Sequence, residues 1–442
     1  MSTPDFERAR AQFIAGNAAF EAGHFEEAES AFLASLEALP GRPSTLVNLG
    51  ATRLRLGRPA EALAPLETAL AANPGDGEAW HHCGVAHAEL GRHREAVAAF
   101  DRALATGHQS AAVHYRRGLA LAALERHDDA AQAWERALAC DDQFVPAWVD
   151  LGSLLRDQGQ RARALQCLER ALSLGADDPM LRFQVAALRE ARQAPEAPPR
   201  AYVQQLFDGY AEGFDAHLVG TLGYRTPQLL AQGLATTGVA HFATALDLGC
   251  GTGLLAEPLR PWVGRLDGMD LSAGMLEKAR ALGRYDRLEQ GDIAEHLQRT
   301  DRRYALVAAA DVFVYLGALE PVFEGVMRVL EPGGVFAFSV EAADGSDAPD
   351  APHTPNPSGS PDGPAGVSAP QPGYQLRSTL RYAHTEHYLR ALARAFGLQV
   401  CATRRHALRQ DHGATIVGLC VWMQRPPLAA SATAAGSAGS TA

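Results

Sequence analysis

The stretch TALDLGCGTG, residues 244–253, decides the fold of the second half of the chain. A short apolar run that carries one acid, Asp247, ends in three alternating glycines: Gly249, Gly251 and Gly253. Glycines allow a backbone turn to approach a ligand closely, and a helix expected from about Leu254 would favour a negative group at its N-terminus. The stretch therefore predicts a strand, a ligand-binding turn and a helix.

The residues around this stretch continue the alternation of strand and helix, which predicts a mostly parallel sheet covered on both faces. Further strands are expected at 265–270, 287–289, 304–310 and, after a turn, within 329–340. Ligands of such folds lie at the carboxyl edge of the sheet. Three acids end or follow strands at this edge: Asp270, Asp292 and Asp311.

The GxGxG spacing behind Asp247 resembles motif I of class I S-adenosylmethionine-dependent methyltransferases, and the resemblance covers about 202–425. It implies an α/β Rossmann-like domain with a seven-stranded, mostly parallel sheet, methyltransferase activity and S-adenosylmethionine as cofactor. It also implies that Asp270 bonds the ribose hydroxyls and that 291–293 contacts the adenine. The cofactor-binding residues implied in this way are Asp247, Gly249, Gly251, Gly253, Asp270, Leu271, Met275, Asp292, Ile293 and Asp311. As alternatives, Asp247 caps the glycine turn and Asp311 caps a strand end.

Two side chains are catalytic candidates, Tyr210 and His384. Methyl transfer is an in-line displacement that requires alignment above all, and a base helps only where the acceptor is a hydroxyl. Tyr210 stands in LFDGYAEGFDAHL, residues 206–218, which in the family covers the cofactor. His384 stands in YQLRSTLRYAHTEHY, residues 374–388, where Thr385 is expected to cap a helix. The alternative for His384 is an ordinary position on a strand or helix near the domain surface.

A 34-residue period fills the first 180 residues, with glycine at Gly16, Gly50, Gly84, Gly118 and Gly152. Sixteen residues after each glycine stands a large apolar residue: Phe32, Leu66, Phe100, Trp134 and Leu168. The spacing predicts two antiparallel helices per unit, with small residues where helices cross closely. The pattern resembles the tetratricopeptide repeat, which implies an all-α solenoid whose surface binds a protein or peptide. Both halves together resemble a bacterial group of predicted methyltransferases that carry these repeats.

Changes in composition set the expected domain limits. The solenoid, closed by a capping helix at 179–193, occupies 1–194, and a proline linker follows at 195–201. The methyltransferase domain occupies 202–427. Within it, 342–373 contains eight prolines and is expected to be a disordered insertion, and 428–442 a disordered tail.

Charge, apolar stretches and the spacing of cysteine and histidine argue against nucleic-acid binding, a membrane span and a metal site. The net charge of -11 comes from 40 basic and 51 acidic residues spread over both halves, so neither half is a basic surface for nucleic acid. The longest apolar stretch, 304–319, is interrupted by Asp311, so no membrane span is expected. The six cysteines lie far apart, and His81, His82 and His87 lack a matching set of carboxylates or thiolates, so no metal is expected. An acidic N-terminus and unpaired cysteines favour a cytoplasmic protein.

Three functions remain open. The first is an S-adenosylmethionine-dependent methyltransferase whose repeats recruit a protein acceptor, or a partner that brings one. The second is an O- or C-methyltransferase of small molecules, with the repeats used for assembly. The third is a non-catalytic adaptor with an S-adenosylmethionine-binding fold.

Overall fold

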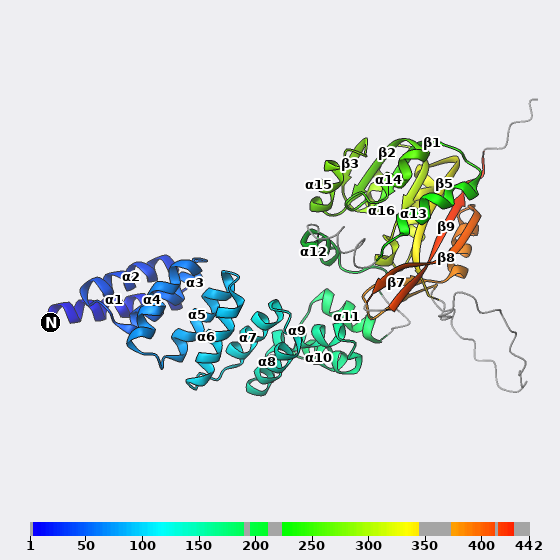
Figure 1. Ribbon diagram of the computed structural model, residues 1–442. Helices are drawn as coiled ribbons and strands as arrows, with labels where there is room; N and C mark the ends of the chain where they lie inside the picture. Colours follow the sequence, from blue (N-terminus) through cyan, green and yellow to red (C-terminus); the bar gives the residue numbers. More distant parts are fainter. Residues whose placement is uncertain (1–2, 190–194, 211–222, 344–372, 412–413, 428–442) are drawn as a thin grey trace, which may run out of the picture. The chain divides into compact units, whose positions relative to one another are not determined.

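The computed structural model describes residues 3–189, 195–210, 223–343, 373–411 and 414–427. These residues form two compact units, Met1–Asp177 and Asp178–Ala442 (Figure 1). Almost all of the expected insertion at 342–373, and the whole of the expected tail at 428–442, lie outside the described residues. No helix within the described ranges has the length and apolarity needed to cross a membrane.

The first unit is made of paired antiparallel helices, and each even-numbered helix packs against the one before it. Its helices are α1 (Thr3–Glu21), α2 (Phe25–Ala38), α3 (Pro43–Arg55), α4 (Pro59–Ala72), α5 (Gly77–Glu89), α6 (His93–Ala105), α7 (Ala111–Ala123), α8 (His127–Cys140), α9 (Val145–Asp157) and α10 (Arg161–Ser173). These helices form five pairs, which confirms the predicted solenoid fold.

The periodic glycines are the points at which the two helices of a pair touch. A Cβ atom at Gly16 would stand 2.6 Å from the Phe32 ring, and one at Gly118 would stand 2.4 Å from Trp134. Such distances are far below van der Waals contact, so any larger residue would push the helices apart. The large residue sixteen positions later is buried in each unit. The period therefore records one packing contact that is repeated along the solenoid.

The second unit contains a sheet, with helices before, between and after its strands. Its helices are α11 (Pro179–Arg189), α12 (Arg200–Tyr210), α13 (Thr226–Gly233), α14 (Ala256–Leu259), α15 (Ala273–Ala281), α16 (Ile293–Arg299), α17 (Glu320–Val329) and α18 (Glu386–Ala395), with short 3-10 turns η2 (Leu234–Thr237), η3 (Arg260–Trp262) and η4 (Phe313–Tyr315). Its strands are β1 (Phe242–Leu248), β2 (Val263–Asp270), β3 (Arg287–Gln290), β4 (Tyr304–Ala309), β5 (Leu330–Ala342), β6 (Tyr374–Leu376), β7 (Tyr382–His384), β8 (Gln399–Asp411) and β9 (Ala414–Gln424).

The sheet contains the expected seven strands in the order β3-β2-β1-β4-β5-β9-β8. The first five strands are parallel, and β9 pairs antiparallel with both β5 and β8. The hairpin β6–β7 joins the end of β5 through a parallel pairing of β7, so the described sheet has nine strands. Most of the strand pairings in the described sheet are parallel, as predicted.

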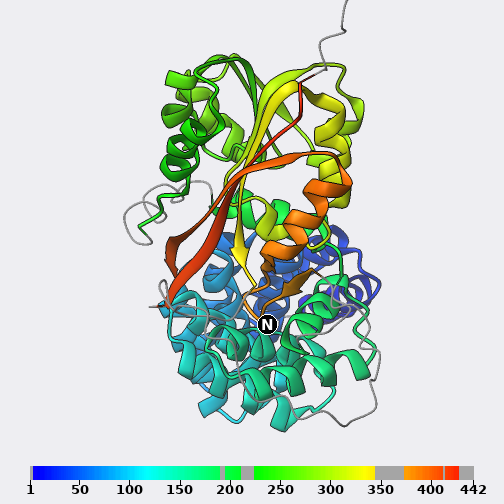
Figure 2. The same cartoon turned by 90° about the vertical axis from the view of Figure 1, so that its right-hand side faces the viewer.

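Helices cover both faces of this sheet (Figure 2). Two neighbouring residues of β4 contact different helices. Val307 packs into a cluster with α16, α17 and α18, whereas Leu306 packs on the opposite side of the sheet with α13 and α14. Successive residues of a strand face opposite sides of the sheet. Since both sides are buried, the strands read as continuous apolar runs instead of alternating ones.

Two segments differ from the expectation. The helix expected from about Leu254 is only four residues long, because Pro258 and Pro261 lack the N–H groups that a longer helix requires. The helix expected to close the solenoid, α11, belongs to the second compact unit. There Phe183 and Ala187 pack against residues of the β6–β7 hairpin, and this contact buries part of the apolar surface of α11.

Candidate functional site

The glycine turn after β1 has a backbone that only glycine adopts readily. Gly249, Gly251 and Gly253 have φ of 65°, 54° and 97°, all in the left-handed region. A Cβ at Gly249 would stand 2.6 Å from Val312, whereas one at Gly251 would meet no atom within 4 Å. The turn is therefore packed against protein at Gly249 and open to the adjoining space at Gly251, so a ligand has room to approach its backbone.

Asp270 ends β2 beside this turn and holds it in place. Its Oδ2 accepts a hydrogen bond from the Gly251 N–H at 2.8 Å, and its Oδ1 accepts one from the Ser272 N–H at 2.9 Å. Burial raises the pKa of Asp270, while these N–H groups and that of Leu271 act against the rise. Each carboxylate oxygen has a second lone pair, so the group retains the capacity to bind two hydroxyls.

Asp247 lies on β1 and is 1% exposed. The Tyr285 hydroxyl donates a hydrogen bond to its Oδ2 at 2.7 Å. Burial raises the pKa of Asp247 to about 7, the charge of Asp270 adds to the rise and the Tyr285 hydrogen bond opposes it. A carboxyl with this pKa changes its charge near neutral pH, and a cation in the adjoining space would favour its ionised form.

The end of β3 supplies a further acid. Asp292 precedes α16, and its Oδ1 accepts hydrogen bonds from the N–H groups of Ala294 at 2.9 Å and Glu295 at 3.2 Å. Asp292 is therefore the N-cap of α16, which fixes the turn at 291–293 across from β2. Leu271 follows Asp270 on the neighbouring strand end, and Met275 is fully buried one turn into α15.

Asp311 follows β4 in a left-handed conformation, with φ of 54°. Its N–H donates to Ser339 Oγ at 2.8 Å, and the Ser339 hydroxyl donates to Asp311 Oδ1 at 2.8 Å. Arg409 of β8 donates to Asp311 Oδ2 at 3.2 Å and also pairs with Glu341, which accepts a further bond from Arg377 at 3.2 Å. A left-handed non-glycine residue costs free energy, and this network of opposite charges holds it in place.

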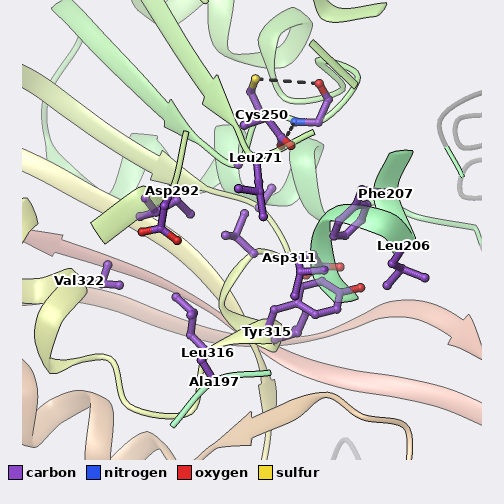
Figure 3. Close-up of a pocket in the computed structure, with 18 of the residues that line it drawn as sticks. Ala197, Leu206, Phe207, Cys250, Leu271, Asp292, Asp311, Tyr315, Leu316 and Val322 are labelled. Carbon is purple, nitrogen blue, oxygen red and sulfur yellow. Dashed lines mark hydrogen bonds between the residues drawn. The ribbon is translucent and has the colours of Figure 1, made fainter. Parts of the chain in front are cut away.

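These strand ends surround one cavity of about 610 Å³, a volume within the ordinary range of ligand sites. Eight of the ten predicted cofactor residues line it: Asp247, Gly249, Gly251, Asp270, Leu271, Asp292, Ile293 and Asp311. Gly253 and Met275 are not among the residues that line it. Figure 3 shows Cys250 and Leu271 at one end of the cavity, and Leu316 and Ala197 at the other.

The catalytic candidates have a different outcome. His384 does not line the cavity and is fully buried, and its Nε2 makes a hydrogen bond of 3.0 Å with the Gly317 carbonyl. Burial lowers the pKa of His384 to about 4, so its ring is neutral at physiological pH. Tyr210 ends α12, but its side chain lies outside the described residues, so its role stays a prediction. Thr385 caps α18 as expected, through a bond from the Tyr388 N–H.

Sequence reasoning missed several residues of the site, among them Tyr285, Ser339, Arg409 and Arg381. Tyr285 bonds Asp247, and Ser339 and Arg409 hold Asp311, while Arg381 lines the cavity. These residues lie on elements that only the topology of the sheet brings together. Nothing in the sequence around each of them indicates that it belongs to the site. Among the described residues, no three histidine, cysteine, aspartate or glutamate side chains are grouped as metal ligands.

Parts of both units match models of known protein families. Residues 245–334 match a family model described as a methyltransferase domain. Three stretches match models described as tetratricopeptide repeats, at 6–43, 53–118 and 145–188.

The relatives cover part of the chain. Methyltransferase-like protein 27 of Homo sapiens is 44% identical over 100 residues, which are 22% of this chain and 40% of that protein. A malonyl-[acyl-carrier protein] O-methyltransferase of Enterobacter lignolyticus is 33% identical over 111 residues, which are 25% of this chain and 44% of that protein. An S-adenosylmethionine-dependent methyltransferase structure from Clostridium acetobutylicum is 18% identical, covers 50% of this chain and 99% of its own, and has a TM-score of 0.35. The chain thus spans about two fifths of the length of these two curated relatives.

Proposed function

We propose that this chain, in which tetratricopeptide repeats precede a methyltransferase domain, transfers a methyl group from S-adenosylmethionine bound in the cavity. The observation that carries the proposal is the placement of eight motif residues around one cavity of ligand size.

The residues present fit this cofactor. Asp270 has lone pairs left for two ribose hydroxyls, and the turn at 291–293 offers a backbone edge and Ile293 to an adenine. The open face of Gly251 leaves room for the methionine part of the cofactor. Asp247, buried beneath the turn, supplies negative charge toward an ammonium or sulfonium group.

The cofactor supplies an activated methyl group on a sulfonium, which leaves as a thioether. The chain's own task is to align the two reactants and to exclude water. Phe207 and Tyr315 form one side of the cavity, with ring centroids 5.3 Å apart at 82°. The Ser339–Arg409 network fixes the carboxylate of Asp311, so its charge stays in place while the methyl group moves. His384 holds the loop at Gly317 and is a positioning residue in this scheme.

We assign recruitment of a protein acceptor, or of a partner that brings one, to the repeats. Solenoids of this kind expose an extended surface that suits a peptide or protein segment. The repeats make up the first unit, and every residue that lines the cavity belongs to the second, so the repeats are not needed to form the cavity.

A second candidate acceptor is a small or carrier-bound carboxylate that is methylated on oxygen. Three arginines line the cavity, Arg200, Arg381 and Arg409, and arginine is well suited to bind a carboxylate. Several of the similar proteins are named malonyl-[acyl-carrier protein] O-methyltransferase.

Calorimetric titration of the full chain with S-adenosylmethionine tests the cofactor. The expected result is one saturable site per chain, and no binding would exclude both enzymatic functions and the cofactor-binding adaptor.

Incubating a whole-cell lysate with the protein and S-adenosyl[methyl-³H]methionine then separates the acceptors. Tritium is counted in precipitated protein and in small-molecule extract. Label in protein supports recruitment of a protein acceptor, whereas base-labile label in extract or on a carrier protein supports the carboxylate. Binding of the cofactor without any transfer supports the adaptor.

A further inference from the structure

The five residues 195–199, here named the joining segment, connect the region before them to α12. The segment is fixed through its main chain. The Pro195 carbonyl accepts a hydrogen bond from the Tyr382 hydroxyl, and the Glu196 carbonyl accepts bonds from the N–H groups of Gly317 at 2.7 Å and Ala318 at 3.4 Å. Because the acceptors are backbone atoms, the side chains of the segment are left free to serve another purpose.

Gly317 is the point where the joining segment, the loop after β4 and the β6–β7 hairpin meet. Its N–H bonds Glu196 and its carbonyl bonds His384. A Cβ at this position would stand 2.6 Å from the Tyr374 ring and 2.8 Å from the Tyr382 ring. Only glycine fits between these rings, so the joining segment is held against a tightly packed loop.

Both neighbours of the joining segment are also attached to the second unit. Before it, Phe183 of α11 packs with the buried hairpin residues around Tyr382. After it, α12 is held by two polar contacts. Asp208 Oδ1 accepts a bond from the Ser272 hydroxyl at 2.5 Å, and Arg200 pairs with Glu295 at 2.9 Å. The segment is therefore part of the unit that contains the cavity.

Three residues of the joining segment line the cavity: Glu196, Ala197 and Pro198. Ala197 is exposed at the rim, whereas Pro198 is buried. Ala197 lies beside Leu316 at the end away from Cys250 and Leu271 (Figure 3). The residues that fit the cofactor lie toward the glycine turn and the ends of β2 and β3, so the end near Ala197 is left for the group that accepts the methyl.

We propose that Ala197 and Pro198 are specificity-determining residues that limit the size of the acceptor at the far end of the cavity. This inference rests on the proposed methyl-transfer function. The matched methyltransferase model begins at residue 245. Ala197 and Pro198 therefore lie outside the part of the chain that this model describes. Selection of the acceptor is thus separable from binding of the cofactor. A larger side chain at 197 blocks the acceptor while leaving the cofactor's contacts intact.

The test compares Ala197→Trp with Gln205→Trp in the full chain. Gln205 is an exposed residue of α12 that does not line the cavity, so it is a matched control for adding an indole nearby. Affinity for S-adenosylmethionine is measured by calorimetry, and transfer by the initial rate of tritium incorporation into a whole-cell lysate. Ala197→Trp is expected to keep its affinity within twofold and to lose at least tenfold in rate. Gln205→Trp and Ala197→Gly are expected to retain both.

Two results would overturn the inference: a Kd for S-adenosylmethionine raised tenfold or more by Ala197→Trp, or an unchanged transfer rate. Failure of the proposed function is distinct, because the wild-type chain would then not bind S-adenosylmethionine or would transfer nothing.

If wild type binds but does not transfer, Ala197→Cys decides the inference. With S-adenosylhomocysteine bound, methyl methanethiosulfonate should still label Cys at 197, as read by mass spectrometry of that peptide. Protection by the bound S-adenosylhomocysteine would place position 197 in the cofactor's part of the cavity and refute the proposal.

Discussion

Asp247→Asn should stabilise the ligand-free protein, and increasingly so as the pH rises from 4 to 7. The folded-state pKa of Asp247, about 7, lies above the ordinary value of 3.8 because the group is buried. Between these two values the unfolded chain has released its proton and the folded chain has not. Stability must therefore fall as the pH rises through this window. Asparagine resembles the protonated acid in shape, can still accept the Tyr285 hydroxyl bond and does not titrate.

The shift from 3.8 to about 7 corresponds to about 4 kcal/mol, which sets the size of the effect. The free energy of unfolding of Asp247→Asn should exceed that of wild type by an amount close to zero at pH 4, by about 2 kcal/mol at pH 5 and by about 4 kcal/mol at pH 7. Above pH 8 this difference should change little. Ionisable groups that do not interact with Asp247 titrate alike in both proteins, so they cancel in the difference.

Urea denaturation followed by pulsed hydrogen exchange of the β1 peptide measures this quantity, because it reports on the second unit alone. Asp286→Asn is a control of opposite sign. The Leu266 N–H and Arg260 lower the pKa of Asp286, so that variant should be less stable than wild type at pH 7, and the deficit should shrink as the pH falls toward 3. A difference between Asp247→Asn and wild type that does not vary with pH, or that makes the variant less stable at pH 8, would refute the reasoning.

Three further predictions concern the cofactor, the packing and the buried histidine. Asp270→Asn places an amide N–H₂ against an N–H donor of the glycine turn, so calorimetry should show S-adenosylmethionine binding weakened by about 1 to 3 kcal/mol. Gly233→Ala would put a Cβ 1.9 Å from the buried Trp422 ring, and urea denaturation should show a loss of about 1 to 3 kcal/mol, whereas Gly209→Ala, with no atom within 4 Å, should show none. Neutral His384 stabilises the fold above pH 6.5, and this contribution of about 3 kcal/mol is lost as the pH falls toward 4, so the stability of His384→Gln should vary less over that range.

The parts of the fold that follow a short period were predictable from the sequence. The 34-residue spacing of Gly118 and its counterparts reports a glycine pressed against a large residue in every pair of helices. The alternation of apolar runs and acids located β1, β2, β3 and β4 within one or two residues. These signals are local, since each arises from the backbone period of a single element and its nearest packing partner.

Contacts between distant segments were not predictable. Arg409 stands 98 positions after its partner Asp311, and Tyr285 stands 38 positions after Asp247. Which strands become neighbours depends on topology, and no period marks a single tyrosine or arginine as a partner of a particular acid. The place of α11 has the same cause. Its amphipathic pattern predicts a helix with one buried face, but the pattern is silent on whether that face meets a repeat or the β6–β7 hairpin.

The charges in the cavity distinguish two classes of ligand that use similar glycine turns. Asp247 and Asp270 are buried side by side beneath the turn, and burial raises the pKa of both, so their ionisation costs free energy in the absence of a ligand. A dinucleotide would place a pyrophosphate at such a turn and add repulsion to that cost. The ammonium and sulfonium groups of S-adenosylmethionine would instead relieve it, because a cation favours the ionised carboxylates. Binding should therefore strengthen as the pH rises from 6 to 8, and Asp247→Asn should weaken that dependence.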